Sequence, residues 1–270
     1  FFINDQLHAH SLQGTRVDNT GDRSQTSQRF RKQLRVENGV RRRIVFDMDS
    51  PLSPRSVWYL DLNPVRTDVT GHADFFDTEK FPGKRTVSQS TYVDPQTVEF
   101  ALTAQGKDIK SLETSDIEGA FDMYKDLGDD VIGWTTGAQA QQQLESGEAV
   151  MGLVWSGRGY GAAAAGAPVA PMWDEWMIMV DSNGIPKGVK DPQAAFAAVN
   201  YSIGAEQQAK MTELTSYGGV NTDAKPEVDD LLSEWITTER LDTGISPNVD
   251  FWVENYDALA AAWAGWATGS

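Results

Sequence analysis

The sequence predicts an α/β fold, because short apolar runs typical of strands alternate with stretches typical of capped helices. The clearest unit begins at Gly137–Glu145, an Ala- and Gln-rich stretch that favours a helix. Gly147 ends it, because glycine readily adopts the left-handed conformation of a helix terminus. Ala149–Trp155 is then an unbroken apolar run, as in a strand covered on both faces. Ligands of open α/β sheets bind beyond such strand ends, which places Trp155 and a loop at Ser156–Tyr160 in a candidate site.

The other elements follow from capping signals and apolar spacing. Asp94-Pro95 and Asp191-Pro192 each predict a helix start, because Asp accepts amide hydrogen bonds and Pro suits the first turn. Ser115–Glu118 resembles a capping box that opens a further helix. Further expected elements are strands at Arg43–Met48, Val57–Leu62, Thr86–Ser90 and Met172–Val180, helices at Ala73–Asp77, Ala205–Leu214 and Val228–Thr238, and a loop at Tyr217–Asn221.

Apolar spacing also predicts which side chains are buried. The inward residues are expected to be Val98, Ala101 and Leu102 in one helix, Ile117, Phe121, Tyr124 and Leu127 in the next, Phe196 and Val199 after Asp191, and the stripe Trp252, Tyr256, Leu259, Trp263 and Trp266 near the end. An aromatic stripe of this kind is typical of a helix that packs on a neighbour.

Composition narrows the possible partners. The 270 residues carry a net charge of −16, include no cysteine, and contain no apolar run near the roughly 20 residues of a membrane helix. The acidic excess lies after residue 70 and repels nucleic-acid phosphates. Basic clusters at Arg29–Lys32 and Arg41–Arg43 have no interleaved aromatic residues, so residues 1–55 are expected to be a poorly ordered or atypical terminus. No nucleic-acid partner is predicted.

Catalytic and metal-binding patterns are weak. The chain has three histidines, and His8 and His10 have no third metal ligand nearby in sequence. The stretch Gly157–Gly161 lacks the Lys and Ser/Thr of a phosphate-binding loop. We therefore expect no enzyme activity, no metal and no cofactor. A hydrolase that uses an unrecognised carboxylate pair, or a truncated product without binding function, remains an alternative.

Several segments together resemble the polyamine-type substrate-binding proteins of ABC transporters, a branch of the two-lobed periplasmic binding proteins. The resemblance covers about residues 56–270, in the family's order, and is carried by Ala73–Arg85, Gly137–Gln141, Ser146–Glu148, Met151–Arg158, Asp181–Gly188, Tyr217–Asn221 and Trp252–Tyr256. Residues 1–55 do not match the family, whose members begin with a longer first lobe.

The resemblance implies an α/β fold of two lobes with the ligand in the cleft between them. By this analogy residues 1–61 and 181–227 form lobe one, which is incomplete or atypical, and residues 62–180 and 228–270 form lobe two. It also implies that the protein closes about a hinge, without covalent chemistry.

The resemblance implies a set of ligand-binding residues. Trp155 matches a position whose ring flanks the ligand, Asp181 matches an acidic residue that binds an amine, and Tyr217 matches a pocket aromatic. Each has a structural alternative: the end of a strand for Trp155 and a turn for Asp181. An aromatic ring attracts a cation by about 0.5–2 kcal/mol, and a carboxylate forms charge-assisted hydrogen bonds with an ammonium group.

Other candidates match the family less closely. Asp94 and Gln96 lie where the family uses acidic side chains, although Asp94 also suits a helix cap. Trp134 and Thr136 precede a helix whose free amides suit an anion or carboxylate. Trp176 suits a core and a pocket equally. Met179 replaces the family's aromatic residue two positions before Asp181, which departs from the polyamine pattern.

From this resemblance we expect a monomeric, periplasmic or membrane-anchored extracellular protein that captures a small cationic ligand, a polyamine, and delivers it to the membrane permease of an ABC transporter. Another small solute, such as an amino-acid derivative or a sugar, is the alternative within the same class.

Overall fold

The computed structural model describes residues 31–37, 40–46, 57–61, 68–90 and 93–267, with side chains from residue 68 onward. The first strands, β1 (Arg31–Glu37), β2 (Val40–Phe46) and β3 (Val57–Asp61), form an antiparallel sheet in sequence order. Arg43 pairs with Leu34 on one side and with Leu60 on the other. Strands near Arg43 and Val57 were expected, whereas the highly charged β1 offered no apolar run. The other expectations for residues 1–55 lie largely outside the described residues.

A second sheet is parallel and has the order β5-β4-β6. Its strands are β4 (Lys84–Ser88), β5 (Val131–Trp134) and β6 (Ala149–Gly152). The central strand β4 is buried, and Val87 is fully enclosed. β6 lies at one edge of this described sheet, and Val150 is 51% exposed. The expectation of a long strand buried on both faces was therefore wrong for Ala149–Trp155.

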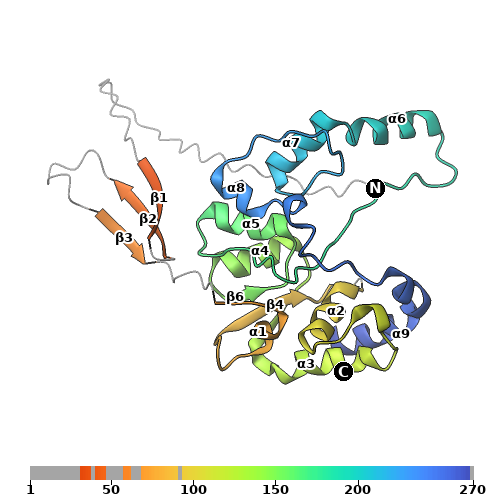
Figure 1. Ribbon diagram of the computed structural model, residues 1–270, viewed down its shortest axis with the longest axis horizontal. Helices are drawn as coiled ribbons and strands as arrows, with labels where there is room; N and C mark the ends of the chain where they lie inside the picture. The colour runs from red at the N-terminus through yellow and green to blue at the C-terminus, as the bar shows by residue number, and fades with distance from the viewer. Residues whose placement is uncertain (1–30, 38–39, 47–56, 62–67, 91–92, 268–270) are drawn as a thin grey trace, which may run out of the picture.

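Helices cover both faces of the parallel sheet, which confirms the α/β class (Figure 1). One face carries α1 (His72–Phe76), α2 (Pro95–Ala104), α3 (Asp116–Asp126) and α9 (Val249–Ala267), and the other carries α4 (Gly137–Glu145) and α5 (Ser156–Ala165). Short 3-10 turns lie at η1 (Ile109–Ser111), η2 (Gly128–Asp130) and η3 (Thr238–Arg240). The main core joins α2, α3 and α9, and it contains the expected residues Val98, Phe121, Tyr124, Leu259 and Trp263.

The helix ends follow local chemistry in most cases. Asp94 and Asp191 cap α2 and α6 (Pro192–Ser202) by accepting amide hydrogen bonds, as expected. Gly147 ends the α4 region with φ +73°. The capping box at Ser115 is not formed, because Ser115 already has helical φ/ψ angles and makes no capping hydrogen bond. Asp116 instead accepts the amide of Glu113 at 2.9 Å.

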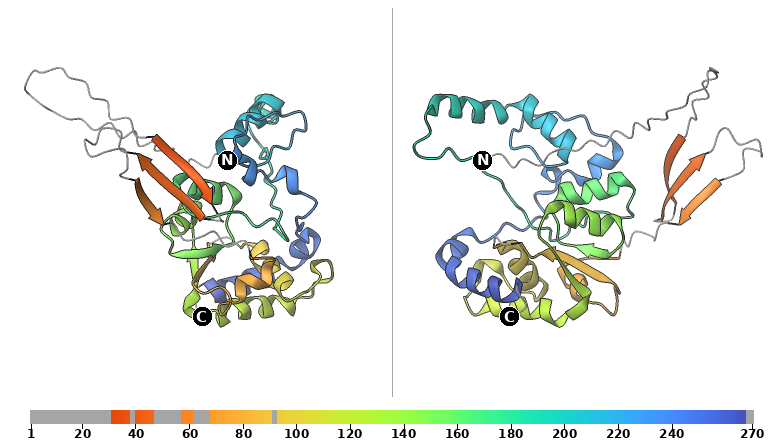
Figure 2. Two further views of the ribbon diagram at one scale, coloured as in Figure 1. Left: turned by 60° about the vertical axis from the view of Figure 1, so that its left-hand side comes forward. Right: turned by 180° about the vertical axis from the view of Figure 1, so that it is seen from behind.

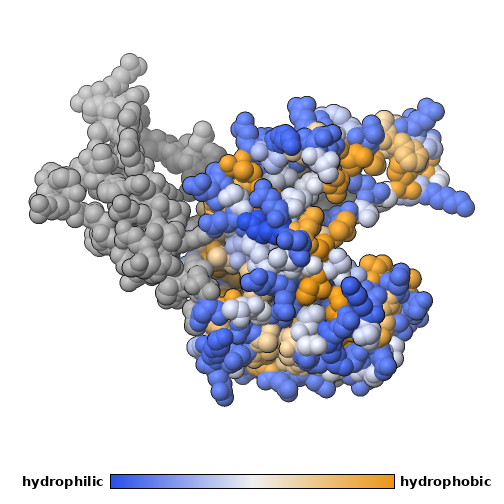
Figure 3. Space-filling model, viewed as in Figure 1, coloured by the Kyte–Doolittle hydropathy of each residue, from blue (hydrophilic) through white to orange (hydrophobic). Residues whose placement is uncertain are grey.

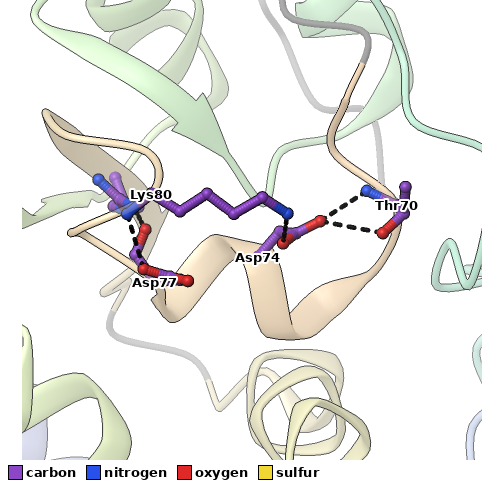
Figure 4. A network of polar contacts seen from close by, with 5 residues as sticks. Thr70, Asp74, Asp77 and Lys80 are labelled. Carbon is purple, nitrogen blue, oxygen red and sulfur yellow. Dashed lines mark hydrogen bonds and ion pairs between the residues drawn. The ribbon is translucent and has the colours of Figure 1, made fainter.

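A polar network fixes the segment that leads into β4 (Figure 4). Asp74 in α1 accepts hydrogen bonds from the amide and hydroxyl of Thr70 and from Lys80 Nζ at 2.9 Å. The Lys80 bond, with that from Thr70, lowers the pKa of the Asp74 carboxyl. The fully buried Arg85 donates to the carbonyl oxygens of Phe75 and Asp77. The stretch Ala73–Arg85 is therefore scaffold.

The remaining helices, α6, α7 (Ala205–Thr215) and α8 (Asp230–Trp235), lie beyond α4 and α5 from the parallel sheet (Figures 1 and 2). The helix α6 contacts α7 and has no buried residue, and Phe196 is 65% exposed. The prediction that Phe196 points inward was wrong, whereas Val199 is half-buried. Figure 3 shows the surface hollowed on the side where α6 lies above the start of α9.

Two extended crossing segments connect these parts of the molecule. Residues 171–178 run beside residues 236–245, and Met177 and Ile245 form a parallel bridge. The backbone amide of Ile178 donates to Ile245 O, and that of Ile245 donates to Trp176 O, each at 2.8 Å. The expected strand Met172–Val180 is thus reduced to one bridge, because a single partner segment leaves the rest of the run unpaired. No described helix is long and apolar enough to cross a membrane.

Candidate functional site

The first wall of the candidate site is built where β5 and β6 end. Trp134 closes β5, is 2% exposed, and donates its indole N–H to Leu153 O at 3.2 Å. Its ring meets Trp155 edge to face with centroids 5.2 Å apart. Trp155 is half-buried and directly precedes α5. The structure therefore makes Trp134 the support behind Trp155.

The residues after Trp155 are helical, so the expected loop at Ser156–Tyr160 was wrong. Because α5 begins at Ser156, Arg158 lies three residues after Trp155, within the first turn of the helix. A methyl group on Gly137 would lie 2.5 Å from Arg158 Nε and 3.0 Å from Trp155 Cζ3. The guanidinium and the indole thus both lie against the start of α4.

The start of α4 is already capped within the chain. The Thr136 hydroxyl accepts the amide of Gln139 at 3.3 Å, and Gln139 in turn accepts the amide of Thr135 at 2.9 Å. These bonds occupy backbone amides that were expected to be free to bind an anion. The main contribution of this helix terminus to the site is therefore Gly137, which Trp155 and Arg158 approach closely.

Tyr217 forms the second wall, in the loop that follows α7. It is half-buried, and its ring reaches the first turn of α5: a methyl group on Gly157 would lie 2.9 Å from Tyr217 Cε1 and Cζ. Burial raises the pKa of the Tyr217 hydroxyl, the positive charge of Arg158 opposes this, and the negative charge of Asp181 adds to it. Charges of both signs therefore act on one phenol.

Asp181 is exposed and follows the crossing segment that carries Trp176. The structure thus brings the ring of Tyr217 to the first turn of α5, directly after Trp155, and the negative charge of Asp181 acts on the Tyr217 hydroxyl. Arg158 joins them; the sequence placed it within the candidate stretch Ser156–Tyr160 without giving it a role of its own. Its signal in the sequence was its spacing of three residues from Trp155, which is visible only once the stretch is known to be helical.

Asp94 and Gln96 lie elsewhere, at the start of α2. The Asp94 carboxylate is buried and accepts the Gln96 amide and the Thr97 hydroxyl, each at 3.2 Å. Burial raises its pKa. Gln96 lines a largely apolar cavity of about 390 Å³ at the start of α9, together with Pro95, Pro247, Val249, Trp252, Val253 and Tyr256. This cavity is lined by none of the residues around Tyr217.

Trp176 connects the two crossing segments. Its indole N–H donates to Arg240 O at 2.9 Å, and its ring meets Trp173 edge to face at 5.3 Å. Trp173 in turn donates its indole N–H to Glu234 O. The Arg240 guanidinium lies over the Trp173 ring, 5.0 Å from the ring centroid. Trp176 therefore has a structural role in holding these two segments together.

Nothing in the described part of the chain gathers three potential metal-ligating side chains. His8 and His10 lie outside the described residues. A second cavity of about 350 Å³ has an acidic lining of Glu213, Glu227 and Asp229 beside Tyr160. Burial raises the pKa of Asp94 and Glu99, the kind of shift a catalytic pair shows, but both carboxyl groups are hydrogen-bonded to the fold itself.

Comparison with known proteins agrees with this fold. Residues 56–241 match the family model of bacterial extracellular solute-binding proteins. The spermidine/putrescine-binding periplasmic protein of Escherichia coli K12 is 25% identical over 195 residues, which are 68% of this chain and 55% of that protein. The chain spans about half the length of the curated relatives it matches.

Solved structures show the same architecture. The Atu4243 GABA receptor is 31% identical, with a TM-score of 0.66 over 73% of this chain and 61% of that one. The binding protein AgtB of A. tumefaciens R10, solved with agropinic acid, is 25% identical, with a TM-score of 0.59 over 74% of this chain and 63% of that one. The chain belongs to the bacterial extracellular solute-binding proteins, a family of binding proteins rather than enzymes, and has the α/β fold of periplasmic binding proteins.

Proposed function

We propose that this protein captures a small solute that carries an ammonium group, at the site formed by Trp155, Arg158, Asp181 and Tyr217. One observation carries the proposal: aromatic and charged side chains meet at the first turn of α5. Trp155 and Arg158 lie against Gly137, and the Tyr217 ring lies against Gly157. The negative charge of Asp181, which acts on the Tyr217 hydroxyl, supports its inclusion in the site. Asp181 supplies the carboxylate for the ammonium group, and the faces of Trp155 and Tyr217 lie along the methylene chain.

A site that combines Arg158 with Asp181 favours a ligand with an acid group as well as an amine. A guanidinium binds a carboxylate through paired hydrogen bonds. An ω-amino acid such as GABA, with opposite charges at its two ends, complements the two side chains. The similar Atu4243 protein, described as a GABA receptor, supports this ligand class.

A polyamine is the second candidate. The spermidine/putrescine-binding relatives support it, as does the net charge of −16. A second ammonium group would face Arg158, and like charges about 6 Å apart repel by about 1–3 kcal/mol in a partly screened site. This repulsion is the reason to rank a polyamine below an ω-amino acid.

The mechanism proposed is capture without covalent chemistry. The exposed segment around Asp181 moves toward the α4–α5 wall, which Tyr217 already contacts, and encloses the ligand. The proposal includes a monomeric protein outside the cytoplasm that hands its ligand to the permease of an ABC importer. It requires no cofactor.

Thermal unfolding with a panel of solutes tests the ligand class. GABA, putrescine, spermidine and glucose would each be added to the folded protein. A ligand present at 100 times its dissociation constant stabilises the fold by about 2.7 kcal/mol, which appears as a raised melting temperature. We expect the largest shift with GABA and none with glucose. A shift with putrescine alone would select the polyamine, and no shift with any amine would refute the proposed function.

A further inference from the structure

We propose that Gly157 is a positioning residue of the binding site: its missing side chain lets the ring of Tyr217 rest on the first turn of α5, beside Arg158. This inference rests on the proposed function, because it concerns the same site. It assigns a specific role to a residue that has no functional group of its own.

The end of α7 fixes the direction of the Tyr217 ring. Ser216, fully buried, has a left-handed φ of +62°, which turns the chain sharply after the helix. The hydroxyl of Thr212 donates to Tyr217 O at 2.8 Å, and Thr215 Oγ1 accepts the Tyr217 amide at 3.2 Å. With its backbone held on both sides, Tyr217 has little freedom to move its ring away from an obstacle.

Gly157 lies directly in the path of this ring. A methyl group at residue 157 would lie 2.9 Å from two ring carbons of Tyr217 and 2.7 Å from Thr215 O. Carbon atoms in contact normally lie about 3.5–4.0 Å apart, so either the ring or the end of α7 would have to shift. Because Thr215 O belongs to the backbone, the shift cannot be confined to a flexible side chain.

The contact between Gly157 and Tyr217 affects binding because the two residues belong to different walls of the proposed site. Gly157 separates Trp155 from Arg158 in sequence, and Tyr217 comes from the 181–227 segment predicted to belong to lobe one. The contact therefore sets the spacing between the two walls of the site. A wider spacing would move the Tyr217 ring away from Trp155 and Arg158 and mismatch a ligand that must contact both walls.

Other glycines of the chain provide matched controls. Gly119 lies within the helix α3, and a methyl group there would meet nothing within 4 Å. Gly157→Ala and Gly119→Ala both replace a helical glycine and gain the same intrinsic helix propensity. They differ in what the added methyl group meets.

The experiment is a double-mutant cycle on GABA affinity, measured by calorimetry with Gly157→Ala, Tyr217→Ala, the double variant and Gly119→Ala. We expect Gly157→Ala to raise the dissociation constant about tenfold or more, since overpacking of this kind is costly. In the Tyr217→Ala background the same substitution should change it by less than about threefold, and Gly119→Ala by less than about twofold.

Three results would overturn the inference. These are unchanged affinity in Gly157→Ala, an equal loss with and without the Tyr217 ring, and an equal loss in Gly119→Ala. If Gly157→Ala alone does not fold, recovery of folding in the double variant supports the contact, and failure to recover counts against it. A wild-type protein that binds neither GABA nor any other amine would instead refute the proposed function, and this inference with it.

Discussion

Two oppositely charged side chains, Asp181 and Arg158, act on one half-buried phenol, Tyr217. A site for a simple diamine needs negative charge at both ends, whereas the proposed site has one charge of each sign. The residues that carry the charge lie on different elements, Arg158 in the first turn of α5 and Asp181 after a crossing segment. In the proposed site, ligand selectivity therefore depends on how these two elements are held relative to each other.

Replacing Arg158 by Gln should invert ligand preference. The variant loses a charge-assisted contact worth about 1.5–3 kcal/mol, so GABA affinity should fall about tenfold or more. Putrescine should bind equally well or better, since a repulsive charge is removed. Calorimetric titration of both ligands checks this, with Lys225→Gln, an exposed cation remote in sequence, as the control. An equal loss for both ligands would show that Arg158 acts only on the fold.

His72 gives the fold a pH dependence. It is buried, its Nδ1 lies 2.6 Å from Thr103 Oγ1, and its Nε2 has no hydrogen-bond partner among the described residues. Desolvation lowers its pKa from 6.5 to about 4, although Glu175 acts in the opposite direction. Because the unfolded chain binds this proton more tightly, the stability contributed by neutral His72 is complete above pH 6.5 and is lost as the pH falls toward 4.

The variant His72→Asn keeps a donor for Thr103 and removes the titration. The difference in unfolding free energy between wild type and variant should therefore shrink between pH 7 and pH 4, as measured by urea denaturation at several pH values. The opposite trend from Asp94 and Glu99, whose pKa values burial raises, is common to both proteins and cancels in the difference. A difference that is constant with pH would contradict the role of His72.

Among the elements, α9 shows where periodicity predicts packing and where it fails. Trp252, Leu259, Trp263 and Trp266 are buried as expected, but Tyr256 is 53% exposed. The cause is local: Asn255 has non-helical angles of φ −117° and ψ 20°, so the helix is interrupted one residue before Tyr256. A kink of this kind shifts the phase of the stripe, and the spacing of aromatic residues alone does not reveal it.

Truncation of two aromatics of α9 should have very different costs. Trp263→Ala removes a side chain that is 3% exposed, donates to Ser90 O and packs on Phe121, so it should destabilise the protein by about 3–5 kcal/mol. Tyr256→Ala should stay within about 1 kcal/mol, because most of that ring already faces solvent. Denaturant unfolding of both variants measures these costs. Similar losses would mean that Tyr256 is packed like the other stripe residues.

The elements also show how far local signals determine a site. Gly137–Glu145, Asp94 and Asp191 follow directly from propensity and capping, and each was predicted to within a residue or two. The residues after Trp155 were expected to form a loop because of their glycines, yet these glycines allow neighbouring elements to approach α5. Gly157 receives Tyr217, and Gly159 receives Trp235. Such tertiary contacts override the low helix propensity of glycine and are not visible in the sequence alone.

At the scale of the whole molecule, the paired crossing segments are the place about which we propose that the protein closes. Trp173, Trp176 and Arg240 join residues 171–178 to residues 234–245 through hydrogen bonds and ring contacts. Beyond Ile178 the chain runs largely exposed through Asp181 to α6. The chain is thus held by contacts up to Ile178 and is exposed after it, which is the arrangement that the proposed closure around a ligand requires.

Calorimetric titration of GABA into the wild-type protein and into Asp181→Asn tests the central claim most directly. Asp223→Asn, which removes an exposed carboxylate in the next loop, is the matched control. We predict that the wild type and the control bind one equivalent with the same affinity. The Asp181 variant should bind at least about tenfold more weakly, because the ammonium group loses its charged partner. Equal affinity in all three proteins would contradict the assignment of the site.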